Sequence, residues 1–310
     1  MRCLQLIVVV LLVCPALPAN AQPTFARTPA SEFERRIATI GGVDALNPMA
    51  PDPARYRVLK RLIEKPDDAL AAVDRLWLEY RATHRPVYAD WALQYGLLWW
   101  QSLPDGADRA EAAALLQKLA AQLSREQPDH PAGPFWFAMF YGLEGLARGV
   151  LNALHMLPTF KDLLDRASTV SRDYFFGAIQ TIQAKMYIKL PPFPVSYGDI
   201  DKGLALLEAG RLQQESVISL WHITRAEALY LKEGPEAALV ALEGIQKICP
   251  RDLLTAYNYE VGMFLAERFR EAIANHTYNR YTWDPLLASV QPLHARDWPI
   301  PKHCKVPSSQ

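Results

Sequence analysis

The chain has 310 residues, about half of them hydrophobic, and its 33 Lys and Arg residues balance its 33 Asp and Glu residues. No run of basic residues alternates with aromatic ones, so the sequence argues against nucleic acid as a partner. The length is ample for one large core or for an extended array of repeats.

The first 21 residues have the features of a secretory signal peptide. Arg2 gives a positive start, an apolar run covers 4–13, and Ala19–Ala21 is a cleavage site of the small-x-small type. The residue before Cys14 is Val, whereas a lipoprotein signal has a small residue there. An uncleaved anchor is the alternative, although the apolar run is short for a membrane span. We expect export to the periplasm with cleavage after Ala21.

After cleavage, two of the four cysteines remain, Cys249 and Cys304. An exported chain with two cysteines predicts one disulfide, which would tie the C-terminal tail to a helix end. The loop-entropy model gives such a bond a stabilising effect of about 3–4 kcal/mol. Two free thiols too far apart to bond are the alternative, because sequence gives no distance. No CxxC or HExxH motif occurs, so we expect neither a metal site nor a cofactor.

Prolines and glycines divide most of the chain into helical segments. A flexible leader is expected over 22–30, and then a short helix opens near Ser31 and ends at Gly41. Further helices are predicted at 53–64, 67–83, 87–102, 107–126, 134–157, 160–171, 173–190, 199–214, 217–233, 235–248 and 252–278. No alternating strand pattern occurs, so the predicted class is all-α. We expect a helical-repeat domain over 22–282 and an extended tail over 283–310 that packs on the last repeats.

The segment 134–157 is predicted to be one helix of about six turns that is apolar on most sides. Glu144, Arg148, Asn152 and His155 follow at steps of four, four and three, which places them in one polar line. This line is a candidate ligand-binding surface, because the planar guanidinium of Arg148 suits a carboxylate. The alternative is an ordinary solvent-facing Glu144–Arg148 pair, worth a few tenths of a kcal/mol.

Two further groups are candidates for binding. Trp99, Trp136, Phe140 and Tyr141 could line an apolar ligand cavity, although aromatic residues at helical spacing are often core residues. The loop 190–198 is rich in Pro and carries Phe193 and Tyr197. Loops on rigid scaffolds often carry function, so these two residues are candidates for a rim or partner contact. The alternative is a packed insertion that covers an apolar groove.

The predicted helices recur as hairpins. Their short connections make consecutive helices antiparallel neighbours, and helix starts recur at about 35–47 residues, a spacing typical of helical-hairpin repeats. Between Trp221 and Pro250, Gly234 lies in a turn and Ala238 supplies a small residue in the second helix. This stretch is similar to the second half of a tetratricopeptide repeat. The sequence therefore predicts a tetratricopeptide-like solenoid of stacked helical hairpins.

A narrower resemblance covers residues 130–214. Phe135–Ala138, Leu163–Ala167, Leu190–Pro194 and Gly198–Leu204 follow one another in an order that resembles the T component associated with tripartite periplasmic (TRAP) transporters. The resemblance implies a non-enzymatic periplasmic protein with a pocket or pore for an apolar or amphipathic small molecule. It also implies docking to a periplasmic solute-binding protein and self-association as a homo-oligomer. That family is typically lipid-anchored, and this chain departs from it at the signal peptide.

The expected function is that of an exported binding protein, acting as a ligand-handling or adaptor component. The alternative is a protein-binding scaffold of the cell envelope. An enclosed apolar cavity would favour the first function, and an open groove with polar walls would favour the second. An enzyme, such as a sugar-cleaving hydrolase, has less support. Glu144 is the one acid isolated in an apolar context, and Arg148 beside it would favour its ionised form.

Overall fold

The computed structural model describes residues 25, 27–50, 53–62, 65–103, 106–148, 150–250, 252–281 and 304. Within these ranges the chain forms thirteen α-helices and two short 3-10 segments, and no strand is present. The 3-10 segments are Val43–Leu46 and Gly244–Lys247. The helices are α1 Ala30–Ala38, α2 Pro53–Leu62, α3 Pro66–Thr83, α4 Pro86–Ser102, α5 Ala107–Glu126, α6 Ala132–Ala147, α7 Val150–Val170, α8 Tyr174–Lys189, α9 Ile200–Ala209, α10 Arg211–Gln214, α11 Ser219–Glu233, α12 Pro235–Glu243 and α13 Leu253–Ala274. The predicted all-α helical-hairpin fold is confirmed.

Local signals explain several helix starts. Pro66, Pro86 and Pro235 occupy the first position of α3, α4 and α12, where a missing N–H costs no helical hydrogen bond. Asp252 caps α13 by accepting a hydrogen bond from the Thr255 backbone N–H at 2.8 Å. In turn, the Thr255 hydroxyl oxygen accepts a hydrogen bond from the Asp252 backbone N–H at 3.1 Å, which completes a capping box.

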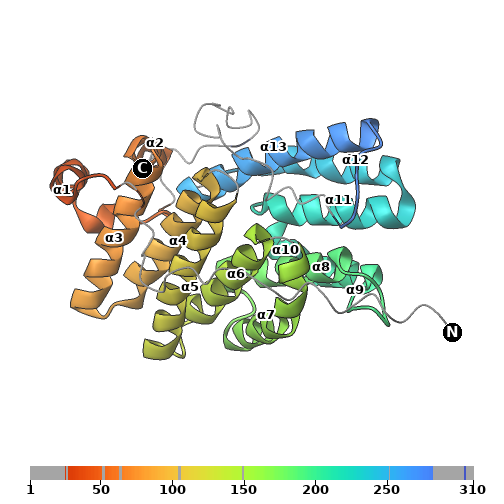
Figure 1. The fold of residues 1–310 in the computed structure, drawn as a ribbon. Helices are drawn as coiled ribbons and strands as arrows, with labels where there is room; N and C mark the ends of the chain where they lie inside the picture. The colour runs from red at the N-terminus through yellow and green to blue at the C-terminus, as the bar shows by residue number, and fades with distance from the viewer. Residues whose placement is uncertain are drawn as a thin grey trace.

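Consecutive helices pack as hairpins, and Figure 1 shows α3 to α9 following one another across the molecule. The α3/α4, α5/α6, α6/α7, α8/α9 and α11/α12 pairs make the most extensive contacts. Helices α5 and α6 approach very closely at Gly133, where a Cβ atom would lie 2.6 Å from the Cα atom of Ser124. A glycine is therefore needed at this crossing.

The last helix returns to the beginning of the array. Helix α13 contacts α2, and the backbone N–H of Leu254 donates to the Pro48 carbonyl at 3.3 Å. The Lys60 ammonium lies 2.9 Å from the Glu260 carboxylate. Figure 1 shows α13 running from this region back toward α12. An open solenoid needs contacts between neighbouring repeats only, so the solenoid arrangement itself stays a prediction.

The prediction of one continuous helix over 134–157 is wrong. Helix α6 ends at Ala147, Arg148 caps it through a backbone N–H that donates to the Glu144 carbonyl at 3.0 Å, and α7 starts at Val150. Helices α6 and α7 then pack against each other as a hairpin. The reversal lets both helices bury apolar side chains against each other, which a single rod could not do.

The prediction that Pro158 ends a helix is also wrong, because α7 continues through Pro158 to Val170. A proline inside a helix costs roughly 3 kcal/mol, and packing between α6 and α7 offsets this cost. The Phe160 ring, two residues after Pro158, lies against Gly142 of α6. A Cβ atom at position 142 would be only 2.7 Å from this ring.

Two predicted helices are shorter than expected. Instead of one helix over 199–214, α9 and α10 are separated at Gly210. Instead of a helix over 235–248, α12 ends at Glu243 and a 3-10 turn follows it. Both segments lose regular α-helical geometry at a glycine, which is the weakest helix former after proline.

The ends of the chain are described in part. Residues 1–21 and all of 283–310 except Cys304 lie outside the described residues, so the signal peptide and the packing of the tail stay predictions. Cys249 and Cys304 are placed as a disulfide, with their Cα atoms 5.4 Å apart.

The segment 22–30 was expected to be a flexible leader. Where the structure describes it, the segment contacts the core: the Phe25 and Trp99 rings meet edge-on with their centroids 4.8 Å apart. In the ranges that the structure describes, no helix combines the length and the apolar character that crossing a membrane requires.

Candidate functional site

The predicted polar line is not formed. Glu144 lies on α6, Arg148 caps that helix, and His155 is exposed on α7. The side chain of Asn152 lies outside the described residues. The Arg148 guanidinium is 2.8 Å from the Glu144 carboxylate, and its side chain is 48% exposed. The Glu144 side chain is 15% exposed, so only the arginine of the pair is well exposed to solvent, and a role of these residues in ligand binding stays a prediction.

The predicted aromatic cluster belongs to the core. Trp99, Trp136 and Phe140 are fully buried, and Tyr141 is half-buried. The rings of Trp136 and Phe140 stack with their centroids 5.7 Å apart. These side chains fill space between helices, so three of the four aromatic residues expected at a ligand cavity are instead packing residues.

A polar network borders this aromatic core, and the sequence pattern did not predict it. One carboxylate oxygen of Asp90 accepts hydrogen bonds from the Tyr174 hydroxyl at 2.5 Å and from the Trp136 indole N–H at 2.9 Å. The Gln94 side-chain amide donates to the same oxygen at 3.1 Å. Burial, together with the Asp90 charge, raises the pKa of Tyr174 well above its ordinary value, so the phenol remains a donor.

The backbone next to Tyr174 has an unusual conformation. Phe175, Phe176 and Gly177 have φ angles of 53°, 58° and 71° and form a left-handed turn at the start of α8. Such angles cost a non-glycine residue about 1–3 kcal/mol, and they persist where the surroundings hold them. The Phe175 ring packs 5.2 Å from that of Trp136, and the Gln214 amide donates to the Gly177 carbonyl at 2.7 Å.

The network joins three helices. Asp90, Trp136 and Tyr174 belong to α4, α6 and α8, so their hydrogen bonds connect three hairpins. The donors around Asp90, which is partly buried, hold its carboxylate in place. The sequence offered one signal for it, the unusual run Tyr174–Gly177 at a predicted helix start.

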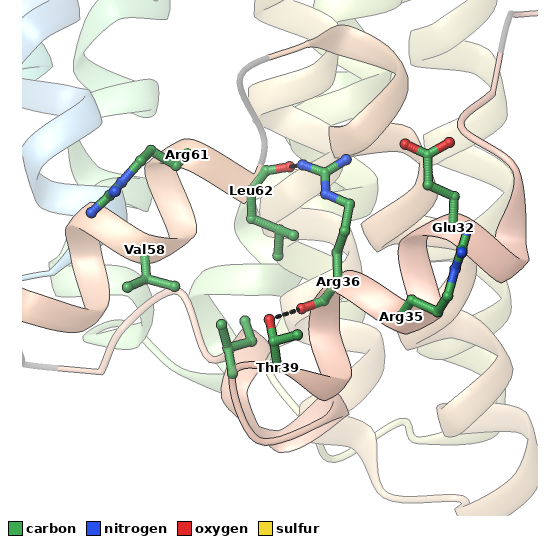
Figure 2. Close-up of a pocket in the computed structure, with 8 residues that line it drawn as sticks. Glu32, Arg35, Arg36, Thr39, Val58, Arg61 and Leu62 are labelled. Atoms are coloured by element: carbon green, nitrogen blue, oxygen red, sulfur yellow. Dashed lines mark hydrogen bonds between the residues drawn. The ribbon is translucent and has the colours of Figure 1, made fainter.

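A hollow of about 500 Å³ lies between α1 and α2 (Figure 2). Its walls include Arg35, Arg36 and Arg61, together with apolar Val58 and Leu62. The Arg36 guanidinium is held from within, because it donates to the Leu62 carbonyl at 2.6 Å and to the Asp68 carboxylate at 2.6 Å. Figure 2 shows the Arg61 side chain directed away from that of Arg36. The cations therefore do not converge on one anion-binding point.

The loop 190–198 begins at buried Leu190 and is exposed over its central part. Phe193 is 87% exposed, Val195 78% and Tyr197 48%. Phe193 and Tyr197 were predicted as rim or partner contacts from their place in the loop, whereas Val195 was not. The loop therefore presents the most exposed aromatic side chain among the described residues.

The histidines and carboxylates of the described ranges do not form a metal centre, since no group of three or more His, Cys, Asp or Glu is arranged to hold an ion there. Comparison with models of known protein families finds no match for this chain, and a search of characterised proteins finds no significant similarity. The function is therefore argued from the geometry.

Proposed function

We propose that this chain is an exported, non-catalytic binding protein whose helical hairpins form a scaffold for docking a partner protein in the cell envelope. The burial of Trp99, Trp136 and Phe140 carries the proposal. These side chains were the best candidates for the wall of a ligand cavity, and they pack in the core. Recognition on the outer surface of the hairpins is the function that this arrangement supports best.

Two observations support a non-catalytic function. The Glu144 carboxylate is paired with the Arg148 guanidinium at 2.8 Å. Asp90 is partly buried and is engaged by three donors. In the setting that the TRAP resemblance implies, the docked partner is a periplasmic solute-binding protein.

The test is native mass spectrometry of the mature chain purified from the periplasm after mild chemical crosslinking. We expect a complex with one partner protein at fixed stoichiometry, and a sample without crosslinker serves as the control. A chain that carries a stoichiometric small molecule and no protein would overturn the proposal.

Ligand handling is the second candidate, favoured by the hollow between α1 and α2. Its volume of about 500 Å³ lies within the usual size range of small-molecule sites, and Val58 and Leu62 give it an apolar part. If this function is correct, solvent extraction of the denatured protein will release an amphipathic molecule. Val58→Asp should then lower the amount recovered, whereas Leu78→Asp, at a position 65% exposed on α3, should not.

A further inference from the structure

We infer that the loop 190–198 is the element through which this scaffold docks its partner, and that the partner offers an apolar pocket with a cationic rim. The inference rests on the proposed binding function and names the surface and the partner chemistry. It combines a fixed loop stem, an exposed apolar tip and the charges around the loop.

The stem of the loop is closed by backbone hydrogen bonds. The Gly198 N–H donates to the Pro191 carbonyl at 2.8 Å, and the Asp199 N–H donates to the Tyr187 carbonyl at 2.9 Å. A Cβ atom at Gly198 would lie only 2.0 Å from the Leu190 carbonyl oxygen. The two arms of the stem can therefore approach this closely only with glycine at position 198.

A second clamp comes from the far end of the chain. Arg280, which follows α13, donates from its guanidinium to the Ile188 carbonyl at 2.6 Å and to the Leu190 carbonyl at 2.7 Å. These charge-assisted bonds satisfy carbonyls at the end of α8. The loop is thus held from both sides before any partner binds.

The tip of this fixed loop is apolar. Phe193, Val195 and Tyr197 alternate along the loop and are all exposed. Pro191, Pro192 and Pro194 reduce the conformational freedom of the free loop. A preorganised aromatic side chain loses little entropy on binding, and such anchors contribute much of the binding energy at protein interfaces. Single exposed apolar residues are common, but this grouping on a clamped loop is typical of a docking element.

The loop itself carries no cationic side chain. Lys189 before it pairs with Glu227 at 2.5 Å, and the ammonium of exposed Lys202 after it lies 4.2 Å above the Tyr187 ring. An anionic membrane surface attracts proteins through clusters of several Lys and Arg residues, and residues 190–201 contain none, so the sequence disfavours lipid as the occupant.

Exposed charges of both signs follow the loop. Asp199, Asp201 and Lys202 are all exposed around the start of α9, and Asp201 pairs with Lys232 at 2.5 Å across the surface. Asp199 is the charged residue nearest in sequence to Tyr197 of the tip, and its carboxylate accepts a hydrogen bond from the Lys202 backbone N–H at 2.9 Å. Charge complementarity to the Asp199 carboxylate favours a partner pocket bordered by Lys or Arg.

The test places a photoreactive phenylalanine analogue at position 193 of the full chain, expressed with its own signal peptide. The matched control places it at position 78, which is exposed on α3. We expect one protein adduct at position 193 with at least a tenfold higher yield than at position 78. The crosslinked partner peptide, identified by mass spectrometry, should come from an apolar pocket bordered by Lys or Arg.

A second variant tests preorganisation separately from the tip. Gly198→Ala keeps Phe193 and Val195 and disturbs the stem, so it should lower the adduct yield at least fivefold. Ser196→Ala, in the same loop, should leave the yield within twofold. Circular dichroism will show whether both variants remain folded. If Gly198→Ala unfolds, Val195→Ser replaces it, because it keeps the probe at position 193 and should lower the adduct yield by removing an exposed apolar residue of the tip.

Several outcomes would overturn the inference: equal yields at positions 193 and 78, an adduct with a second copy of this chain, or flotation of the protein with phosphatidylglycerol vesicles that depends on Phe193. If Phe193→Ser leaves the partner complex intact in native mass spectra, the loop assignment fails and the proposed function stands. If the unmodified chain forms no partner complex, the proposed function fails as well.

Discussion

At the scale of single residues, the core of this protein depends on a few polar side chains among many apolar ones. Asp90 and Tyr174 lie between helices whose other contacts are aromatic. A carboxylate that is partly removed from water is stabilised by donors around it. Two of the three donors, Trp136 and Tyr174, come from segments far away in sequence, which is why the local pattern around Asp90 did not predict the network.

Tyr174→Phe tests this network. The change removes the hydroxyl that donates to Asp90 and keeps the ring in place. We expect the free energy of unfolding to fall by about 1.5–3 kcal/mol, the usual worth of a hydrogen bond to a charged group. Urea denaturation measures the change. Tyr141→Phe, at a half-buried ring for which no hydrogen bond is described, should change it by less than about 0.5 kcal/mol.

His222 predicts a dependence of stability on pH. Its ring is buried, its Nε2 atom lies 2.8 Å from the Glu215 carbonyl, and burial lowers its pKa even though the Glu215 charge opposes this shift. Arg225 lowers the pKa further. Above about pH 6.5 the ring is neutral in both the folded and the unfolded chain. Below that pH the unfolded chain takes up a proton more readily, so stability should fall as the pH drops.

Urea denaturation at pH 7.5 and pH 5.5 measures this dependence. His222→Gln should flatten the loss of stability between the two values, whereas His155→Gln, at an exposed position, should preserve it. Burial also lowers the pKa of His130, so a residual slope of the same sign is expected in the His222 variant. An unchanged slope in His222→Gln would contradict the assignment.

At the scale of helices, local signals and tertiary contacts compete. Prolines at first helical positions and the capping box at Asp252 act within a few residues, and the helices start where these signals predict. Gly149 is a local stop signal within the apolar run over 134–157, but the periodicity of the run suggested one rod. The chain instead reverses after Ala147, because two packed helices bury more apolar surface than one.

Gly133→Ala tests the close packing of α5 on α6. The added methyl group would lie 2.6 Å from the Ser124 Cα atom, and a backbone atom cannot move aside without shifting the helix. We expect a loss of about 1–3 kcal/mol in the free energy of unfolding. Gly96→Ala is the matched control, since its methyl group would meet the movable side chain of Leu116 and alanine favours the helix. A smaller loss for Gly133→Ala than for Gly96→Ala would contradict the described crossing.

At the scale of the whole molecule, α13 connects the end of the array to its beginning. Glu260 is nearly buried and Lys60 is about three-quarters buried, and the two side chains join α13 to α2. Such a contact makes the stability of the first helices depend on the last one, in contrast to an open repeat array.

Lys60→Met tests this connection. Removing the cation should lower the free energy of unfolding by about 1–3 kcal/mol. This loss is smaller than the loss expected on breaking a fully buried ion pair, because Lys60 is partly exposed. Hydrogen exchange should also become faster in α2 and at the start of α13. Lys161→Met breaks the more exposed pair with Asp165 and should cost less than about 1 kcal/mol. Equal effects of the two substitutions would show that α13 does not stabilise α2.

The sequence by itself determined that this chain is built of helical hairpins, because prolines, glycines and caps act on their immediate neighbours. It also indicated that the loop 190–198 carries exposed aromatic residues, since prolines exclude it from a helix. Only the tertiary structure decided that Trp136 and Phe140 lie in the core, that Glu144 and His155 lie on different helices, and that α13 returns to α2. Helical periodicity shows which side of a helix is apolar, but what that side packs against depends on residues far away in the sequence.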